Sequence, residues 1–131
     1  GLQALMTHSE ENGGVDCLDV IPGDVRYFGN PLTGADGERL KVPHMGWNEV
    51  NQVKPHPLWA GIENGTRFYF VHSYYVQAQD RSLVAGSVDY GVSFDAALAR
   101  DNLFAAQFHP EKSASAGLTL LHNFLNWNGQ C

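Results

Sequence analysis

Residues 103–113 read LFAAQFHPEKS, an apolar run followed by a histidine, a proline and a glutamate. The nearly unbroken apolar run from Leu103 to His109 predicts a strand that is buried on both faces. A helix is predicted from about Ser113 to Trp127, with Gly129 as a suitable stop. The large apolar side chains of that helix fall on one stripe: Leu118, Leu121, Phe124 and Leu125. A buried strand that leads into a helix indicates an α/β fold, in which sites form beyond the carboxyl ends of strands.

The polar residues at the end of this strand have the chemistry of a catalytic pair. Residues two apart in an extended segment point to the same side, so Glu111 can reach the imidazole of His109. A carboxylate bonded to one ring nitrogen fixes the tautomer and leaves the other nitrogen as a base. The pattern predicts His109 and Glu111 as the base and the orienting acid of a triad that still needs a nucleophile. Taken alone, it also fits a histidine that ends a strand beside a solvated acid.

The remainder of the chain predicts one further helix and a series of strands. Leu2, Leu5 and Met6 have the spacing of one buried helix face, and the helix should end near Glu11 because Asn12-Gly13-Gly14 follows. Strands are predicted at residues 15–21, 25–28, 41–53 (two pieces around Gly46), 67–76, 82–89 and 90–94. A surface turn is predicted at 31–39, and a loop or single helical turn at 55–61 that places Leu58 and Trp59 in the core. One helix at each end cannot cover both faces of such a sheet, so part of its packing should come from elsewhere.

Composition limits the classes of function. The 131 residues suit one domain, and 44% apolar with 17% charged residues is globular. Fourteen acids against eight bases, with no basic cluster, argue against nucleic acid or an anionic membrane as partner, and the apolar runs are too short to span a bilayer. The six histidines and the two cysteines, Cys17 and Cys131, have no metal-ligand spacing, so neither a metal nor a disulfide framework is predicted. A reducing, cytoplasmic setting is expected.

Several motifs resemble one enzyme family. His-Pro-Glu after an apolar strand and before a helix is similar to the signature of class I glutamine amidotransferases. Gly1-Leu2-Gln3 resembles the end of that family's Gly-x-Cys-x-Gly elbow, which carries the nucleophile. PHMGWN at 43–48 and FVHSY at 70–74 are similar to segments of the glutaminase subunits of imidazole glycerol phosphate synthases. The resemblance covers essentially all 131 residues.

The resemblance implies an α/β, class I glutamine amidotransferase fold of the flavodoxin-like or hydrolase-like kind. Residues 1–131 are then expected to be the C-terminal part of a single domain that lacks the N-terminal strands and the nucleophile elbow. The catalytic cysteine is expected two residues before Gly1, so the chain alone should be inactive. Neither cysteine is expected to replace it: acids flank Cys17, which raises a thiol pKa, and Cys131 is the last residue.

The resemblance also assigns roles to individual residues. Gln3, His72, Ser73 and Tyr74 are expected to bind the substrate, the last three mainly through backbone groups. Gly46, Trp47, Asn48 and Tyr69 are expected to face a synthase partner. Without the resemblance, Trp47 fits a core as well as an interface, His72 fits a core histidine, and both tyrosines fit sheet packing.

The implied activity is hydrolysis of glutamine to glutamate and ammonia, with no cofactor or metal. The ammonia would pass to a (β/α)₈-barrel cyclase that forms imidazole glycerol phosphate in histidine biosynthesis. Two alternatives stay open. One is another class I amidotransferase domain, whose partner would be a nucleotide-activating synthetase or a chorismate enzyme. The other is a non-catalytic docking module that lacks the cysteine nucleophile.

Overall fold

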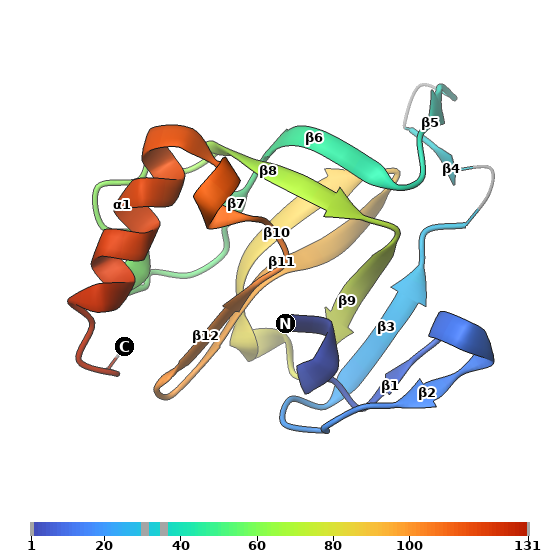
Figure 1. The fold of residues 1–131 in the computed structure, drawn as a ribbon, viewed down its shortest axis with the longest axis horizontal. Coiled ribbons are helices and arrows are strands. Elements are labelled where there is room, and N and C mark those ends of the chain that lie inside the picture. Colours follow the sequence, from blue (N-terminus) through green and yellow to red (C-terminus); the bar gives the residue numbers. More distant parts are fainter. Residues whose placement is uncertain (1, 30–31, 35–36, 131) are drawn as a thin grey trace.

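A mixed sheet forms the centre of the computed structural model, which describes residues 2–29, 32–34 and 37–130 (Figure 1). Its eight described strands run in the order β2-β1-β3-β9-β11-β10-β7, with β12 paired to β11. They are β1 (His8–Ser9), β2 (Val15–Asp16), β3 (Gly23–Tyr27), β7 (Asn51–Gln52), β9 (Tyr74–Ala78), β10 (Val84–Tyr90), β11 (Val92–Arg100) and β12 (Leu103–Ala106). β1 and β3 are parallel, and the other pairings described within this sheet are antiparallel.

Two smaller strand pairs accompany this sheet. β6 (His44–Glu49) and β8 (Arg67–His72) pair antiparallel, so that His44 lies opposite His72 and Trp47 lies opposite Tyr69. β4 (Leu32–Thr33) and β5 (Arg39–Leu40) pair antiparallel at the two ends of the segment predicted as a surface turn, 31–39, of which residues 31, 35 and 36 lie outside the described part. The helical elements are η1 (Leu2–Leu5), η2 (Glu11–Gly13), η3 (Pro57–Trp59), η4 (Arg81–Leu83), η5 (Pro110–Lys112) and α1 (Ala114–Leu125). The chain is therefore mixed α/β, as predicted.

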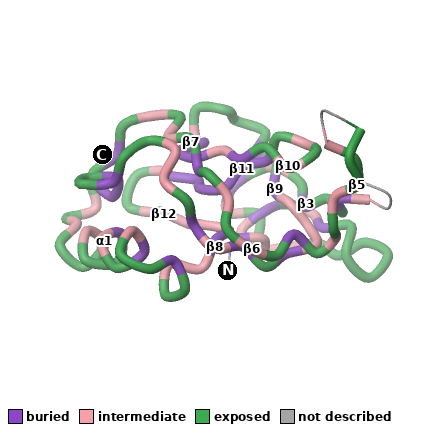
Figure 2. Tube along the Cα trace, turned by 90° about the horizontal axis from the view of Figure 1, so that it is seen from above, coloured by how far each residue is buried: buried purple, intermediate pink, exposed green. Residues whose placement is uncertain are grey.

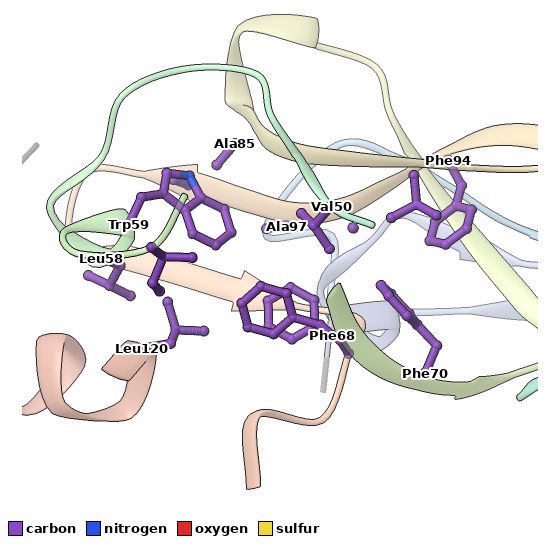
Figure 3. Packing of buried hydrophobic residues seen from close by; sticks show 14 of the residues in the cluster. Val50, Leu58, Trp59, Phe68, Phe70, Ala85, Phe94, Ala97 and Leu120 are labelled. Atoms are coloured by element: carbon purple, nitrogen blue, oxygen red, sulfur yellow. The ribbon is translucent and has the colours of Figure 1, made fainter. Parts of the chain in front are cut away.

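The larger core cluster lies between β8 and the β10–β11 hairpin (Figure 3). Phe68 and Phe70 of β8 point toward Phe94 and Ala97 of β11, and Leu58 and Trp59 pack beside them as predicted. A second cluster joins the N-terminal residues to β3 and β9: Leu2, Met6, Ile21, Val25, Val76, Ala78, Val84 and Leu98. Buried residues are concentrated on β8, β10 and β11 (Figure 2).

The predicted N-terminal helix is wrong. Leu2 and Met6 are buried as their spacing suggested, but they belong to a short 3₁₀ turn and the residue that follows it. The N–H groups of Thr7 and Glu10 bond to carbonyl oxygens of β3 at 3.0 and 2.9 Å, and so are not available to a helix. The strand predicted at 15–21 is likewise limited to β2, because the N–H groups of residues 17–21 bond to the carbonyl oxygens of residues 4–7.

Three strand predictions need correction in detail. The extended segment at 41–53 breaks at Val50 and passes straight through Gly46, and the segment at 67–76 divides into β8 and β9 at Ser73. The strand predicted at 103–109 ends at Ala106, and its predicted burial on both faces is wrong, since all residues of β12 are half-buried. The strands predicted at 82–89 and 90–94 are confirmed as β10 and β11, which pair antiparallel, although β11 continues to Arg100.

The predicted C-terminal helix is confirmed as α1, but its apolar stripe is exposed. Leu118, Phe124 and Leu125 are 66%, 51% and 81% exposed, whereas Gly117 and Leu120 are buried against the rest of the chain. No helix of the described residues is both long enough and apolar enough to cross a membrane.

Candidate functional site

The structure brings the predicted catalytic pair together. His109 ends the segment that follows β12, and η5 starts immediately after it with Pro110. Nδ1 of His109 lies 2.9 Å from Oε1 of Glu111, and both side chains are partly exposed. The backbone N–H of Glu111, and after it the His109 ring, lower the pKa of the Glu111 carboxyl, so the carboxylate is charged at neutral pH. A proton on Nδ1 leaves the lone pair on Nε2 of His109, the arrangement that a general base needs.

The His109 turn is fixed to β8 by both of its backbone groups and by a buried hydroxyl. The N–H of His109 donates to the carbonyl of Tyr69 at 2.9 Å. Oγ of Ser113 donates to the carbonyl of His109 at 2.6 Å and accepts from the N–H of Tyr69 at 3.0 Å. Ser113 is 1% exposed, so water cannot easily replace it. The sequence predicted Ser113 only as a helix start, because its partner Tyr69 lies 44 residues away.

Close packing of α1 holds the other side of the same turn. A Cβ atom on Gly117 would lie 1.9 Å from the carbonyl oxygen of Pro110 and 2.9 Å from Cβ of Ser113. Only a residue without a side chain permits this approach. The first turn of α1 therefore sets the position of the turn that carries His109 and Glu111.

Three of the four predicted substrate-binding residues meet at one carbonyl group. Nδ1 of His72 lies 2.7 Å, and Nε2 of Gln3 lies 3.3 Å, from the carbonyl oxygen of Tyr74. The remaining one, Ser73, lies between β8 and β9, and its carbonyl accepts from the N–H of Phe28 at 3.1 Å. The sequence did not predict Gln107, whose Oε1 lies 3.4 Å from Nε2 of Gln3. Its position two residues before His109 was the signal that could have found it.

His72 is also part of a buried histidine pair. Nδ1 of His44 lies 2.9 Å from Nε2 of His72, and the two residues are 3% and 6% exposed. Burial, assisted by His72, lowers the pKa of His44 to about 4. Burial also lowers the pKa of His72 to about 4, although the bond to Tyr74 opposes this shift and His109 adds to it. Both rings are therefore neutral at pH 7. The interpretation of His72 as a hydrogen-bonded core histidine holds, and any substrate role is additional to it.

The predicted partner residues lie on the β6–β8 pair. The rings of Trp47 and Tyr69 meet edge to face with centroids 5.8 Å apart, and Trp47 is 50% exposed, so it is not a core residue. Gly46 has a φ of 133° and open space where a Cβ would be, whereas Asn48 is half-buried and points back toward His44 and the carbonyl of Asp89. Exposed aromatic and apolar side chains on a rigid strand pair are typical of an interface.

Neither cysteine has a described contact with the catalytic pair. Cys17 follows β2, and its Sγ lies 3.7 Å from the carbonyl oxygen of Val15. Cys131 lies outside the described residues. Among the residues that the structure describes, no group of three or more His, Cys, Asp and Glu side chains could hold a metal ion.

Comparisons with a family model and with individual relatives agree on the family of this chain. Residues 1–127 match the sequence model of the family described as "Glutamine amidotransferase class-I". The chain is 60% identical over 129 residues to the imidazole glycerol phosphate synthase subunit HisH of Nitrosococcus oceani, covering 98% of this chain and 59% of that protein. The subunits of the same name from Hydrogenovibrio crunogenus and Pseudomonas putida are each 58% identical over 130 residues. Those matches cover 99% of this chain and 59% and 61% of the relatives. The chain thus spans about 60% of the length of the relatives that it matches.

Proposed function

We propose a glutaminase function from the premise that this chain belongs to the class I glutamine amidotransferase family. The reaction is hydrolysis of glutamine to glutamate and ammonia. Residues 1–131 would form the C-terminal part of one such domain. The observation that carries the proposal is the 2.9 Å contact between His109 and Glu111 on a turn that is fixed by Ser113 and Gly117.

In this proposal, a cysteine thiolate attacks the carboxamide carbon of glutamine. His109 is the catalytic residue that takes the proton of the thiol, gives it to the departing ammonia, then takes a proton from the water that releases glutamate and returns it to the thiolate. Glu111 holds the ring of His109 and stabilises its charged form. Chain 1–131 contains only Cys17 and Cys131, neither in an elbow motif, so we place the thiol in the part of the full-length protein outside these residues. Without that thiol the rate should fall by about 10⁶.

The proposed glutamine site extends from His109 to the turn between β8 and β9. Gln3, His72, Ser73 and Tyr74 would hold the amino-acid end of the substrate, mainly through backbone groups. The contacts of Gln3 and His72 with the Tyr74 carbonyl support this assignment, because they gather three of the four residues at one point. The buried hydrogen bonds of this turn would keep it in shape before glutamine arrives.

The proposed partner is the cyclase subunit of an imidazole glycerol phosphate synthase, a (β/α)₈ barrel that consumes the ammonia in the cytoplasm. The relatives are themselves subunits of that synthase, which supports the proposal. Gly46, Trp47, Asn48 and Tyr69 would form the contact surface. This surface adjoins the His109 turn, since Tyr69 bonds directly to His109 through the backbone. Ammonia released at His109 would therefore emerge close to the partner.

The test uses the complete coding sequence that contains residues 1–131, expressed together with the cyclase. Glutamate release and the formation of imidazole glycerol phosphate are measured with glutamine, and product formation is measured again with ammonium salt. His109→Ala should reduce the glutamine-dependent rate by about 10⁴- to 10⁶-fold and leave the ammonia-dependent rate unchanged. His122→Ala, which changes an exposed histidine on α1, is the matched control and should retain both rates.

Each alternative gives a different result in this experiment. Full glutaminase activity in His109→Ala would refute the proposal. Binding to the cyclase without glutaminase activity in the wild-type complex would indicate a docking module. Activity that depends on a nucleotide-activating synthetase or a chorismate enzyme would indicate another class I domain.

A further inference from the structure

A chain of hydrogen bonds crosses the core from β6 to the turn between β8 and β9. Nδ2 of Asn48 lies 3.5 Å from Nε2 of His44, and Nδ1 of His44 lies 2.9 Å from Nε2 of His72. Nδ1 of His72 then lies 2.7 Å from the carbonyl oxygen of Tyr74. Two imidazole rings thus connect a residue of the proposed partner surface with the proposed glutamine site.

The carbonyl at one end fixes the direction of every bond. A carbonyl oxygen can only accept, so Nδ1 of His72 must carry the proton. Because the ring of His72 is neutral, its Nε2 is an acceptor and Nδ1 of His44 must donate to it. Nε2 of His44 is then an acceptor for the amide N–H of Asn48. The same amide also contacts the carbonyl oxygen of Asp89 at 3.4 Å, which agrees with its being the donor.

Aromatic packing holds both rings in these positions. The ring of His44 stacks on Tyr90 with centroids 3.9 Å apart and on Phe70 with centroids 5.1 Å apart. The ring of His72 has Phe28 and Phe94 at 5.1 and 5.0 Å. With at most 6% of either residue exposed, neither ring can turn to another partner without opening the core.

We propose that His44 is a positioning residue for the glutamine site. Its Nδ1–H holds His72 in the tautomer that donates to Tyr74, and so fixes the backbone of the turn that receives the substrate. The inference rests on the proposed function, because it takes that turn as the glutamine site. It adds a residue that lies within the core, away from the proposed reacting groups, and that acts only through His72.

The same hydrogen bonds connect the proposed partner surface with the proposed glutamine site. Asn48 follows Trp47 on β6, so a partner that docks at Trp47 contacts the strand from which the network starts.

The experiment compares His44→Leu with His44→Asn in the complete protein assembled with its cyclase. Leucine keeps an apolar group but removes the donor, so the KM for glutamine should rise about 5- to 20-fold while kcat changes less. Asparagine can place an amide N–H close to the position of Nδ1 and should restore KM to within about threefold of wild type. A merely structural role would lower the active fraction, and hence the apparent kcat, of both variants without separating their KM values.

A second readout does not depend on activity. ¹⁵N NMR of histidine-labelled wild-type protein should show His72 as the Nδ1–H tautomer, and His44→Leu should lose this single state. A wild-type His72 in the Nε2–H tautomer, or an unchanged KM in an active His44→Leu complex, would overturn the inference. If the wild-type complex hydrolyses no glutamine, the proposed function fails, and the proposed positioning role of His44 fails with it. The tautomer then shows separately whether the hydrogen-bond network itself exists.

Discussion

Oγ of Ser113 lies 2.6 Å from the carbonyl oxygen of His109 and accepts the N–H of Tyr69 on its other side. One buried hydroxyl therefore satisfies two backbone groups that belong to different elements. Ser113→Ala removes this partner from both groups, of which the His109 carbonyl keeps the N–H of Lys112 at 3.1 Å and the Tyr69 N–H loses its bond to Ser113, and we expect a loss of about 1–3 kcal/mol in the free energy of unfolding. Urea titration of the complete protein measures it. Ser115→Ala, at an exposed position of the same helix, should change that free energy by less than about 0.5 kcal/mol. Equal effects of the two substitutions would contradict the role of Ser113.

The buried histidine pair should make stability depend on pH. The folded pKa values of His44 and His72, about 4, lie below the ordinary value of 6.5, so between these limits the unfolded chain binds more protons than the folded one. The contribution of the pair is complete above about pH 6.5 and is lost as the pH falls toward 4. Tyr90 and His109 face the pair, and a charge on His109 opposes protonation of His72 further.

The measurement is the urea midpoint of unfolding at pH 7, 6 and 5. We expect the midpoint to fall steadily over this range. His44→Leu removes one of the two titrating groups and should roughly halve the decrease. A midpoint that stays constant from pH 7 to 5, or a decrease that is the same in both proteins, would contradict the assignment.

Asp95 of β11 is a buried charge whose contribution to stability can be tested. The carboxylate is 1% exposed and accepts two bonds from Arg81, at 2.6 and 2.8 Å, and one from the N–H of Ala78 at 2.7 Å. Arg81→Gln leaves a buried charge with one remaining donor and should destabilise the protein by about 2–4 kcal/mol. Arg67→Gln breaks an exposed pair with Glu49 at 4.0 Å and should cost less than about 1 kcal/mol. Thermal or urea unfolding of both variants makes the comparison; similar losses would show that Asp95 does not depend on Arg81.

The exposed face of α1 should govern the behaviour of chain 1–131 in solution. Leu121 and Phe124 line a hollow of about 210 Å³ between α1 and the β12 side of the sheet, and Leu118 and Leu125 on the same helix are largely exposed. An uncovered apolar surface of this kind promotes self-association. We expect chain 1–131 to self-associate in sedimentation experiments, and the double variant Leu118→Lys/Leu125→Lys to do so less. Val53→Lys, at an exposed apolar position on another part of the surface, is the control. A wild-type chain that stays monomeric at high concentration would contradict the prediction.

Local sequence patterns predicted the elements whose hydrogen bonds are local. The stripe from Leu118 to Leu125 predicted α1, and the two adjoining strand patterns at 82–89 and 90–94 predicted β10 and β11. The N-terminal segment was predicted wrongly because its donors bond to β3 and its carbonyl groups bond to residues 17–21, and neither partner is visible in a periodicity. The same limit explains β12, whose composition resembles a central strand although β11 is its one neighbour among the described strands.

In the candidate site, too, local contacts could be predicted from the sequence and distant ones could not. His109 and Glu111 are two residues apart, so their contact could be predicted from the sequence, whereas the roles of Gln3, His72, Ser73 and Tyr74 came only from the family resemblance. His44 and Ser113 were missed, because their partners His72 and Tyr69 lie 28 and 44 positions away. Their importance depends on the register of β6 against β8 and on the docking of η5 on β8, which only the folded chain defines.

Gly117 gives the most direct test of how the fold positions the catalytic pair. A Cβ at this position would lie 1.9 Å from the carbonyl oxygen of Pro110, a backbone atom that cannot rotate away. Gly117→Ala must therefore push α1 from the turn that carries His109 and Glu111. The overpacking costs about 1–3 kcal/mol, which exceeds the gain of up to about 1 kcal/mol from better helix propensity. A shift of about 1 Å in the pair can reduce the rate by about 10²-fold.

We expect the complete complex with Gly117→Ala to lose glutamine-dependent turnover while it keeps ammonia-dependent turnover. Ser115→Ala is the neighbouring control that should keep both. If Gly117→Ala raises stability and retains full turnover, then α1 and the His109 turn can separate without cost, and the position of the pair must be set by Tyr69 and Ser113 alone.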